Sequence, residues 1–169
     1  MSAVRSVEKS CGKSKESVVD GFVFDKVFVG SDMGGFEGKL EVIRVLLSLG
    51  VECIDLGVKD VQKPSDYPKY AKKVVGEVVG TVNSCGILIC GSGTGMQIAA
   101  NKFGGVRAAF SFDVYSARMA RLDNDANVLT LRGREFDLKK YEEIIETFLR
   151  TAFSNEERHI RRLKQIEEG

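Results

Sequence analysis

The stretch GILICGSGTGMQIAANK, Gly86–Lys102, decides the fold class of this 169-residue chain. It opens with an apolar run that ends on Cys90, passes through a glycine-rich turn, and continues into a helix-like segment. This order is typical of a buried parallel strand that turns into a helix. A turn that only binds a nucleotide does not need a cysteine between the strand and the glycine-rich turn. The position of Cys90 therefore raises the question of function.

Strand-like and helix-like segments alternate on both sides of this stretch. Short β-branched and apolar runs predict strands, and apolar residues at helical spacing predict helices between them. The alternation indicates an α/β fold with a five-stranded parallel sheet and helices on both faces. Cys85–Gly91, the most apolar strand, is expected at the centre of the sheet. The other expected strands are 26–31, 51–57, 105–111 and 127–131, and the expected helices are 36–50, 68–82, 94–102, 113–122, 138–151 and 155–167.

The length favours one domain, expected over residues 26–169. Residues 1–25 are rich in Ser, Lys and Glu without a clear period, which predicts a disordered N-terminal extension. The net charge of +1 gives no whole-chain signal for nucleic acid or an anionic membrane surface. No apolar run approaches membrane-spanning length, and the N-terminus lacks the apolar core of a signal peptide. We therefore expect a cytoplasmic protein that binds neither nucleic acid nor membrane.

The cysteines and the single histidine are not spaced as metal ligands. No metal site and no cofactor are expected. Cys53, Cys85 and Cys90 fall in strand-like runs, where free cysteines behave as small buried hydrophobes, a pattern that suits a reducing compartment.

Polar groups gather where the predicted strands end, which in a parallel sheet is one edge. They are Asp32 and Met33, then Ser65, Asp66 and Tyr67, then Cys90 with Gly91, Ser92, Gly93, Thr94 and Gly95, then Ser111 and Asp113, and finally Arg132 and Arg134. The glycines allow backbone N–H groups to point at an oxyanion, and the same groups favour a thiolate. Cys90 is then a base or nucleophile beside an oxyanion hole, or a core residue like Cys85.

Two further patterns leave alternatives open. Gly91, Gly93 and Gly95 give GxGxG, a weak match to a dinucleotide-binding turn, with Asp113 near the distance of a ribose-binding carboxylate. Arg158 and Arg162 lie four residues apart and share a helix face, which suits either solvent exposure or a grip on a phosphate.

The motifs taken together resemble the B-type ribose-5-phosphate isomerases, whose family also holds galactose-6-phosphate isomerase subunits. The similar segments are GSDMGGFEGK, SDYPKYA, GILICGSGTGMQIAANK, GVRAAF, SARMARLDNDANVLTLRGR and ERHIRRLKQI, in this order over about Lys26 to Ile166. The resemblance implies a Rossmann-like three-layer sandwich and metal-free active sites shared between the subunits of a homodimer, with dimer and tetramer both open. It also implies that the C-terminal helix reaches a partner subunit.

The resemblance assigns a role to each matching residue. Cys90 is the base that moves a proton between carbons 1 and 2 of the open-chain sugar, through a cis-enediolate held by the turn. The turn residues are Gly91, Ser92, Gly93, Thr94 and Gly95. Asp32, Tyr67 and Asn124 contact substrate hydroxyl groups, whereas Arg134 and the partner's Arg158 and Arg162 bind the phosphate.

Two positions depart from the family pattern, which has histidine at both. Met33 stands where a histidine helps to bind the phosphate end, and a thioether carries no charge and donates no hydrogen bond. Asp123 stands where a histidine assists ring opening, and it can act as an acid if burial or Asp125 raises its pKa. Phosphate binding is therefore expected to rely more on the arginines, and ring opening is expected to be slower or to rely on water or on Asp123.

The expected activity is the interconversion of D-ribose 5-phosphate and D-ribulose 5-phosphate, a step of the pentose phosphate pathway. The alternatives are isomerisation of allose 6-phosphate or galactose 6-phosphate, a non-catalytic phosphosugar-binding protein, and a nucleotide-binding domain that uses the glycine turn and Asp113.

Overall fold

A computed structural model describes residues 21–168 as alternating strands and helices. The strands are β1 (Lys26–Ser31), β2 (Glu52–Asp55), β3 (Ser84–Cys90), β4 (Ala108–Phe110) and β5 (Val128–Arg132). The α-helices are α2 (Phe36–Ser48), α3 (Tyr67–Gly80), α4 (Thr94–Ala100), α5 (Val114–Leu122), α6 (Tyr141–Arg150) and α7 (Glu157–Glu167). Two 3-10 turns, η1 (Met33–Gly35) and η2 (Leu138–Lys140), precede α2 and α6.

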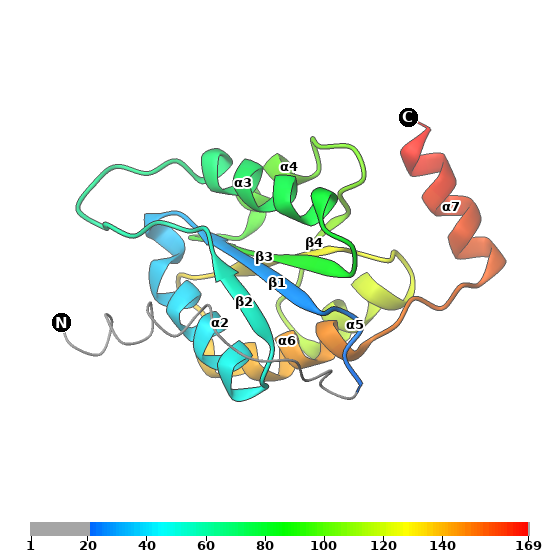
Figure 1. Ribbon diagram of the computed structural model, residues 1–169, viewed down its shortest axis with the longest axis horizontal. Helices are drawn as coiled ribbons and strands as arrows, with labels where there is room; N and C mark the ends of the chain where they lie inside the picture. The colour runs from blue at the N-terminus through cyan, green and yellow to red at the C-terminus, as the bar shows by residue number, and fades with distance from the viewer. Residues whose placement is uncertain (1–20, 169) are drawn as a thin grey trace.

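The five strands form one parallel sheet in the order β2-β1-β3-β5-β4. Helices α3 and α4 cover one face of this sheet, and α2, α5 and α6 cover the other (Figure 1). The expected three-layer sandwich with its five-stranded parallel sheet is therefore confirmed. The strand order reverses between β1 and β3, and in open parallel sheets such a reversal marks the ligand-binding edge.

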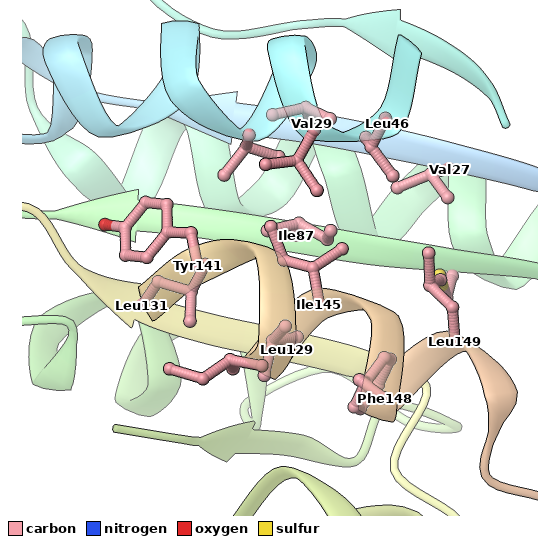
Figure 2. Packing of buried hydrophobic residues seen from close by; sticks show 14 of the residues in the cluster. Val27, Val29, Leu46, Ile87, Leu129, Leu131, Tyr141, Ile145, Phe148 and Leu149 are labelled. Atoms are coloured by element: carbon pink, nitrogen blue, oxygen red, sulfur yellow. The ribbon is translucent and has the colours of Figure 1, made fainter. Parts of the chain in front are cut away.

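The central strand is β3, as its composition predicts. All seven of its residues are buried, because layers of helices cover both of its faces. Figure 2 shows Ile87 of β3 packed among side chains of β1, β5 and α6, including Val29, Leu129 and Ile145. Cys53, Cys85 and Cys90 lie in strands and are buried, as expected.

The boundaries of several elements differ from the expected ones. The strand expected over 105–111 is reduced to three residues, because β4 is an edge strand that pairs only with β5. The helix expected over 138–151 begins with η2, where the carboxylate of Asp137 accepts a hydrogen bond from the backbone of Lys139. Pro68 lies in the first turn of α3, as predicted.

The packed part of the chain begins before β1. Phe24 is 9% exposed, its ring stacks on Phe148 of α6, and the N–H of Val23 donates to the carbonyl of Leu149. Residues 21–25 therefore belong to the folded unit, although they were expected within the extension. The rest of the expected extension, residues 1–20, lies outside the described residues.

Helix α7 differs from the other helices. It extends away from the sandwich (Figure 1), and His159 is the one buried residue among those of α7. The polar composition of this segment predicts that it stays out of the core, and this is confirmed. Within residues 21–168, every helix is too short or too polar to cross a membrane.

Candidate active site

A cavity of about 530 Å³ opens at the carboxyl ends of β1, β3 and β5. This position is the edge beside the reversal of strand order, where parallel sheets bind ligands. The cavity is lined by Asp32, Tyr67, Cys90, Gly91, Ser92, Gly95, Arg132, Arg134 and Glu135. Seven of these nine residues are sequence-predicted site residues, and the topology brings them together from three strand ends and the start of α3.

Cys90 is the last residue of β3, and only 5% of its surface is exposed. Its sulfur accepts a hydrogen bond from the backbone N–H of Gly93 at 3.2 Å. The thiolate is the form of cysteine that acts as base or nucleophile, and a backbone N–H is a suitable hydrogen-bond donor to it. Cys90 also lines the cavity, so its sulfur has access to a ligand there.

The turn between β3 and α4 depends on Gly93. Its φ of +82° is a left-handed conformation that side chains disfavour. A Cβ at this position would lie 2.4 Å from the Cε2 atom of Phe110, so a larger residue does not fit either. Glycine therefore sets both the direction of the chain and the N–H that reaches the sulfur of Cys90.

Asp32 follows β1 directly and is the N-cap of η1. Its carboxylate accepts a hydrogen bond from the N–H of Gly35 at 3.0 Å. Burial raises the pKa of Asp32 above its usual value, and backbone hydrogen bonds and the positive charge of Arg134 oppose this shift in part. The backbone N–H of Arg134 donates to the carbonyl of Gly91, which holds this arginine beside the glycine turn.

Tyr67 reaches the cavity from the first turn of α3. A Cβ on Gly95 would lie 3.0 Å from the Cζ atom of Tyr67, so the phenol ring lies directly over the start of α4. The hydroxyl of Ser65 accepts a hydrogen bond from the N–H of Met33 and ties this loop to the end of β1. The side chain of Met33 itself is half exposed and does not line the cavity.

Several predicted residues lie elsewhere in the chain. Thr94 is exposed at the start of α4, and Asn124 lines a separate cavity beside β4. Arg158 and Arg162 are exposed on α7, and Arg158 forms an ion pair with Glu156. Within residues 21–168 of one chain, neither the two arginines of α7 nor Asp123 and Asn124 line the cavity of Cys90.

Asp123 is the C-cap residue that follows α5, and it lies beside His159, the one histidine of the chain. The Nε2 atom of His159 lies 3.7 Å from a carboxylate oxygen of Asp123, and its Nδ1 atom lies 2.8 Å from the hydroxyl of Ser154. His159 is 2% exposed, whereas the carboxylate of Asp123 is 39% exposed. The other expected neighbour, Asp125, is held by Arg107 and Arg121.

The arrangement argues against a dinucleotide site. The carboxylate of Asp113 accepts a hydrogen bond from the N–H of Ser116 and caps α5, so it is not placed at the glycine turn. The hydroxyl of Ser116 and, to a smaller extent, its backbone N–H lower the pKa of Asp113. Among residues 21–168, no group of three or more His, Cys, Asp or Glu side chains could hold a metal ion.

A family model described as ribose/galactose isomerase matches residues 27–166. The chain belongs to this family. Ribose-5-phosphate isomerase B of Escherichia coli K12 is 40% identical over 141 residues, which are 83% of this chain and 93% of that protein. The protein of the same name from Mycolicibacterium paratuberculosis is 36% identical over 143 residues, which are 85% of this chain and 90% of that protein.

Solved structures of the family have the same architecture. The ribose 5-phosphate isomerase of Thermotoga maritima aligns with a TM-score of 0.81 at 42% identity, over 85% of this chain and 98% of that one. The type B ribose 5-phosphate isomerase of Trypanosoma brucei aligns with a TM-score of 0.81 at 43% identity, over 86% and 98%. The Rossmann-like fold expected from the resemblance is therefore confirmed.

Two lining residues were not among the predicted site residues, Arg132 and Glu135. The signal for Arg132 was present, because it directly follows the predicted strand 127–131 and was counted among the polar groups at the strand ends, although no role was assigned to it. Glu135 has a φ of +49°, a turn conformation that the sequence does not reveal for a glutamate.

Proposed function

We propose that this chain is an aldose–ketose isomerase that interconverts D-ribose 5-phosphate and D-ribulose 5-phosphate. One observation carries the proposal: the sulfur of Cys90 opens into the cavity and accepts the N–H of Gly93. A base beside backbone donors is what an enediolate reaction requires. The names of the relatives from Escherichia coli and Thermotoga maritima support ribose 5-phosphate as substrate.

In the proposed reaction, the Cys90 thiolate removes the proton from carbon 2 of the open-chain aldose. The electrons of that C–H bond form the double bond between carbons 1 and 2, and the carbonyl oxygen becomes an oxyanion. Cys90 then returns the proton to carbon 1. Transfer of the proton from the oxygen on carbon 2 to the oxyanion on carbon 1 completes the ketose, so the exchange of protons balances without a cofactor.

The glycine turn stabilises the enediolate in this scheme. Backbone N–H groups of Gly91 to Gly95, including Ser92 and Thr94, are the proposed donors, and the N–H of Gly93 serves the thiolate. Asp32 and Tyr67, which also line the cavity, contact substrate hydroxyl groups. The hydrogen bond from Gly35 holds the carboxylate of Asp32 in one orientation for this contact.

The phosphate and ring-opening groups complete the proposal. Arg134 binds the phosphate from within the chain, whereas Arg158, Arg162 and Asn124 come from a partner subunit in a homodimer or tetramer. Their exposure, and the projection of α7 away from the sandwich (Figure 1), fit a role across an interface. Met33 carries no charge and its side chain does not line the cavity, so phosphate binding relies on the arginines.

Asp123 is the proposed acid for ring opening, also supplied by the partner. Its neighbour His159 offers a second site for the proton, since an imidazole 3.7 Å from the carboxylate exchanges protons with it through a small movement. The hydroxyl of Ser154 fixes the orientation of the imidazole. The carboxylate–imidazole pair thus takes the role that a single histidine has in the family pattern.

We also place the protein in the cytoplasm, and we assign residues 26–169 to the isomerase domain together with the segment 21–25 that packs against α6. The free, buried thiols of Cys85 and Cys90 fit a reducing compartment.

The second candidate substrate is a six-carbon phosphosugar such as allose 6-phosphate or galactose 6-phosphate. The family description, which joins ribose and galactose isomerases, favours this candidate. A second cavity of about 500 Å³ shares Arg132 and Glu135 with the first, so the site has room for a longer sugar.

The test is the initial rate of isomerisation of each of the three sugar phosphates by purified protein without added metal. The proposal predicts the highest kcat/KM for ribose 5-phosphate. A higher value for a six-carbon substrate would reassign the substrate, and binding of all three without turnover would make the protein a phosphosugar-binding protein.

A further inference from the structure

Arg132 is the last residue of β5 and Arg134 follows two residues later, and both line the same cavity. Arg132 is paired in register with Cys90 on the neighbouring strand, and side chains at paired positions of a parallel sheet point to the same face. The N–H of Gly133 donates to the carbonyl of Cys90, and that of Arg134 donates to Gly91, so the pairing continues past the strand. Both arginines therefore lie beside the reacting thiol.

The guanidinium of Arg132 is held in place by local contacts. Its Nη2 atom donates to the carbonyl of Glu135, and its planar group lies 5.5 Å from the centre of the Phe136 ring. These contacts use one of the five N–H donors of the guanidinium and leave the others for a ligand. A stacked guanidinium that is already ordered loses less entropy when it binds an anion.

The charges of the two arginines are not neutralised by ion pairs. Within residues 21–168, no carboxylate oxygen lies within 4 Å of a guanidinium nitrogen of Arg132 or Arg134. Glu135 lines the same cavity without such a pair, and the charge of Arg134 acts on Asp32. Several other arginines, including Arg44, Arg107 and Arg121, each have a carboxylate partner. Among the residues that the structure describes, Arg118, Arg161 and Arg162 also have no carboxylate within 4 Å, but they do not line the cavity, whereas Arg132 and Arg134 both do.

We propose that Arg132 is a substrate-binding residue that holds the phosphate together with Arg134, inside a single subunit. This inference rests on the proposed function for the identity of the sugar. Two guanidinium groups present several N–H donors to one phosphate dianion, which is the arrangement that planar donors favour. Arg132 thereby supplies a positive charge that Met33 cannot supply, and it does so without any residue of α7 from a partner.

The test compares Arg132→Gln with Arg44→Gln, a control that removes an exposed arginine of α2 outside the cavity. In Arg132→Gln, the KM for ribose 5-phosphate and the inhibition constant of inorganic phosphate each rise about tenfold or more, because a charged hydrogen-bond pair is lost. KM rises by a larger factor than kcat falls. Arg132→Lys, which keeps the charge but not the planar group, gives an intermediate value, and Arg44→Gln matches the wild type.

A matching rise in KM and in the inhibition constant of phosphate supports the assignment. A loop that had only lost packing would lower kcat without specifically weakening the binding of phosphate. An inhibition constant of phosphate that is the same in wild type and Arg132→Gln overturns it. If the wild type does not isomerise ribose 5-phosphate, the proposed function fails, and calorimetric titration with inorganic phosphate still decides the inference. Weaker phosphate binding in Arg132→Gln then supports it, and equal binding overturns it.

Discussion

The two cysteines of β3 lie on the same strand in different surroundings. Cys85, at the amino end, is fully buried in the core, and burial raises the pKa of its thiol despite the nearby charge of Arg121. Cys90, at the carboxyl end, lines a cavity and accepts the N–H of Gly93. The difference teaches that a thiol becomes a candidate base through the groups at the end of its strand, since both cysteines belong to the same buried strand.

The largest effect is expected for Cys90→Ala. Without the base, kcat for ribose 5-phosphate falls by about 10²–10⁴-fold, the usual contribution of a positioned general base. Steady-state kinetics measure this, and the thermal unfolding midpoint checks that the variant folds. Turnover at the wild-type rate would place the base elsewhere.

The second-largest effect is expected for Gly93→Ala, because this substitution displaces the backbone N–H that donates to the sulfur of Cys90. That donor is what distinguishes Cys90 from Cys85. The positive φ and the contact with Phe110 force the turn to move, and kcat falls by about 10²-fold, as for loss of one oxyanion-hole donor. Gly76→Ala in α3 is the matched control, because a Cβ there meets no atom within 4 Å. Equal activity of the two variants would contradict the role of the turn.

Asp123→Asn separates ring opening from proton transfer. Isomerisation of ribose 5-phosphate, which is mainly cyclic, is expected to slow about 10²-fold, at the lower end of general acid–base contributions. Ribulose 5-phosphate is open-chain, so its exchange of the carbon 1 proton with solvent deuterium keeps most of its rate. Nuclear magnetic resonance follows both reactions in the same variant. Unchanged isomerisation would remove the acid role from Asp123.

Asp32→Asn tests the electrostatics of the cavity. Because the pKa of Asp32 is raised in the folded state, the ionised carboxylate is less stable there than in the unfolded chain. The loss of folding stability caused by ionised Asp32 is absent below pH 3.8 and develops as pH rises through the raised pKa of Asp32. Asp32→Asn therefore gains stability relative to the wild type between acidic and neutral pH, while its KM rises several-fold. Urea unfolding at a series of pH values measures the gain, and a difference independent of pH would contradict the assignment.

The smallest effect on activity is expected for Cys85→Ala. The variant leaves a small cavity in the core, and its free energy of unfolding falls by about 1 kcal/mol, as for other small deletions in packed cores. Its kcat stays at the wild-type value, because Cys85 does not line the cavity. Denaturant unfolding and steady-state kinetics measure both. A large loss of kcat would show that the two thiols are not functionally distinct.

The strands and the cavity were predictable because local patterns determine them. The apolar run of β3 and the glycines after it fix where Cys90 lies, and parallel pairing brings Asp32 and Arg134 to the same edge, where Tyr67 joins them from the start of α3. The functional difference between Cys85 and Cys90 was not predictable from position alone, because it depends on which N–H reaches the sulfur. That contact requires the positive φ of Gly93.

Residues beyond the sheet edge were harder to place. Arg158 and Arg162 were predicted at the site through the resemblance, yet they lie on a projecting helix of the same chain. Sequence spacing describes contacts along one chain and gives no geometry for a partner. The pairing of Asp123 with His159 joins residues that are far apart in sequence, and only the packing of α7 against the end of α5 reveals it.

The central claim is that Cys90, rather than Cys85, moves the proton. The most direct measurement is deuterium incorporation at carbon 1 of ribulose 5-phosphate in heavy water, catalysed by wild type, Cys85→Ala and Cys90→Ala. The account predicts equal exchange by wild type and Cys85→Ala, and exchange at least about 10²-fold slower with Cys90→Ala. Exchange by Cys90→Ala at the wild-type rate would contradict it.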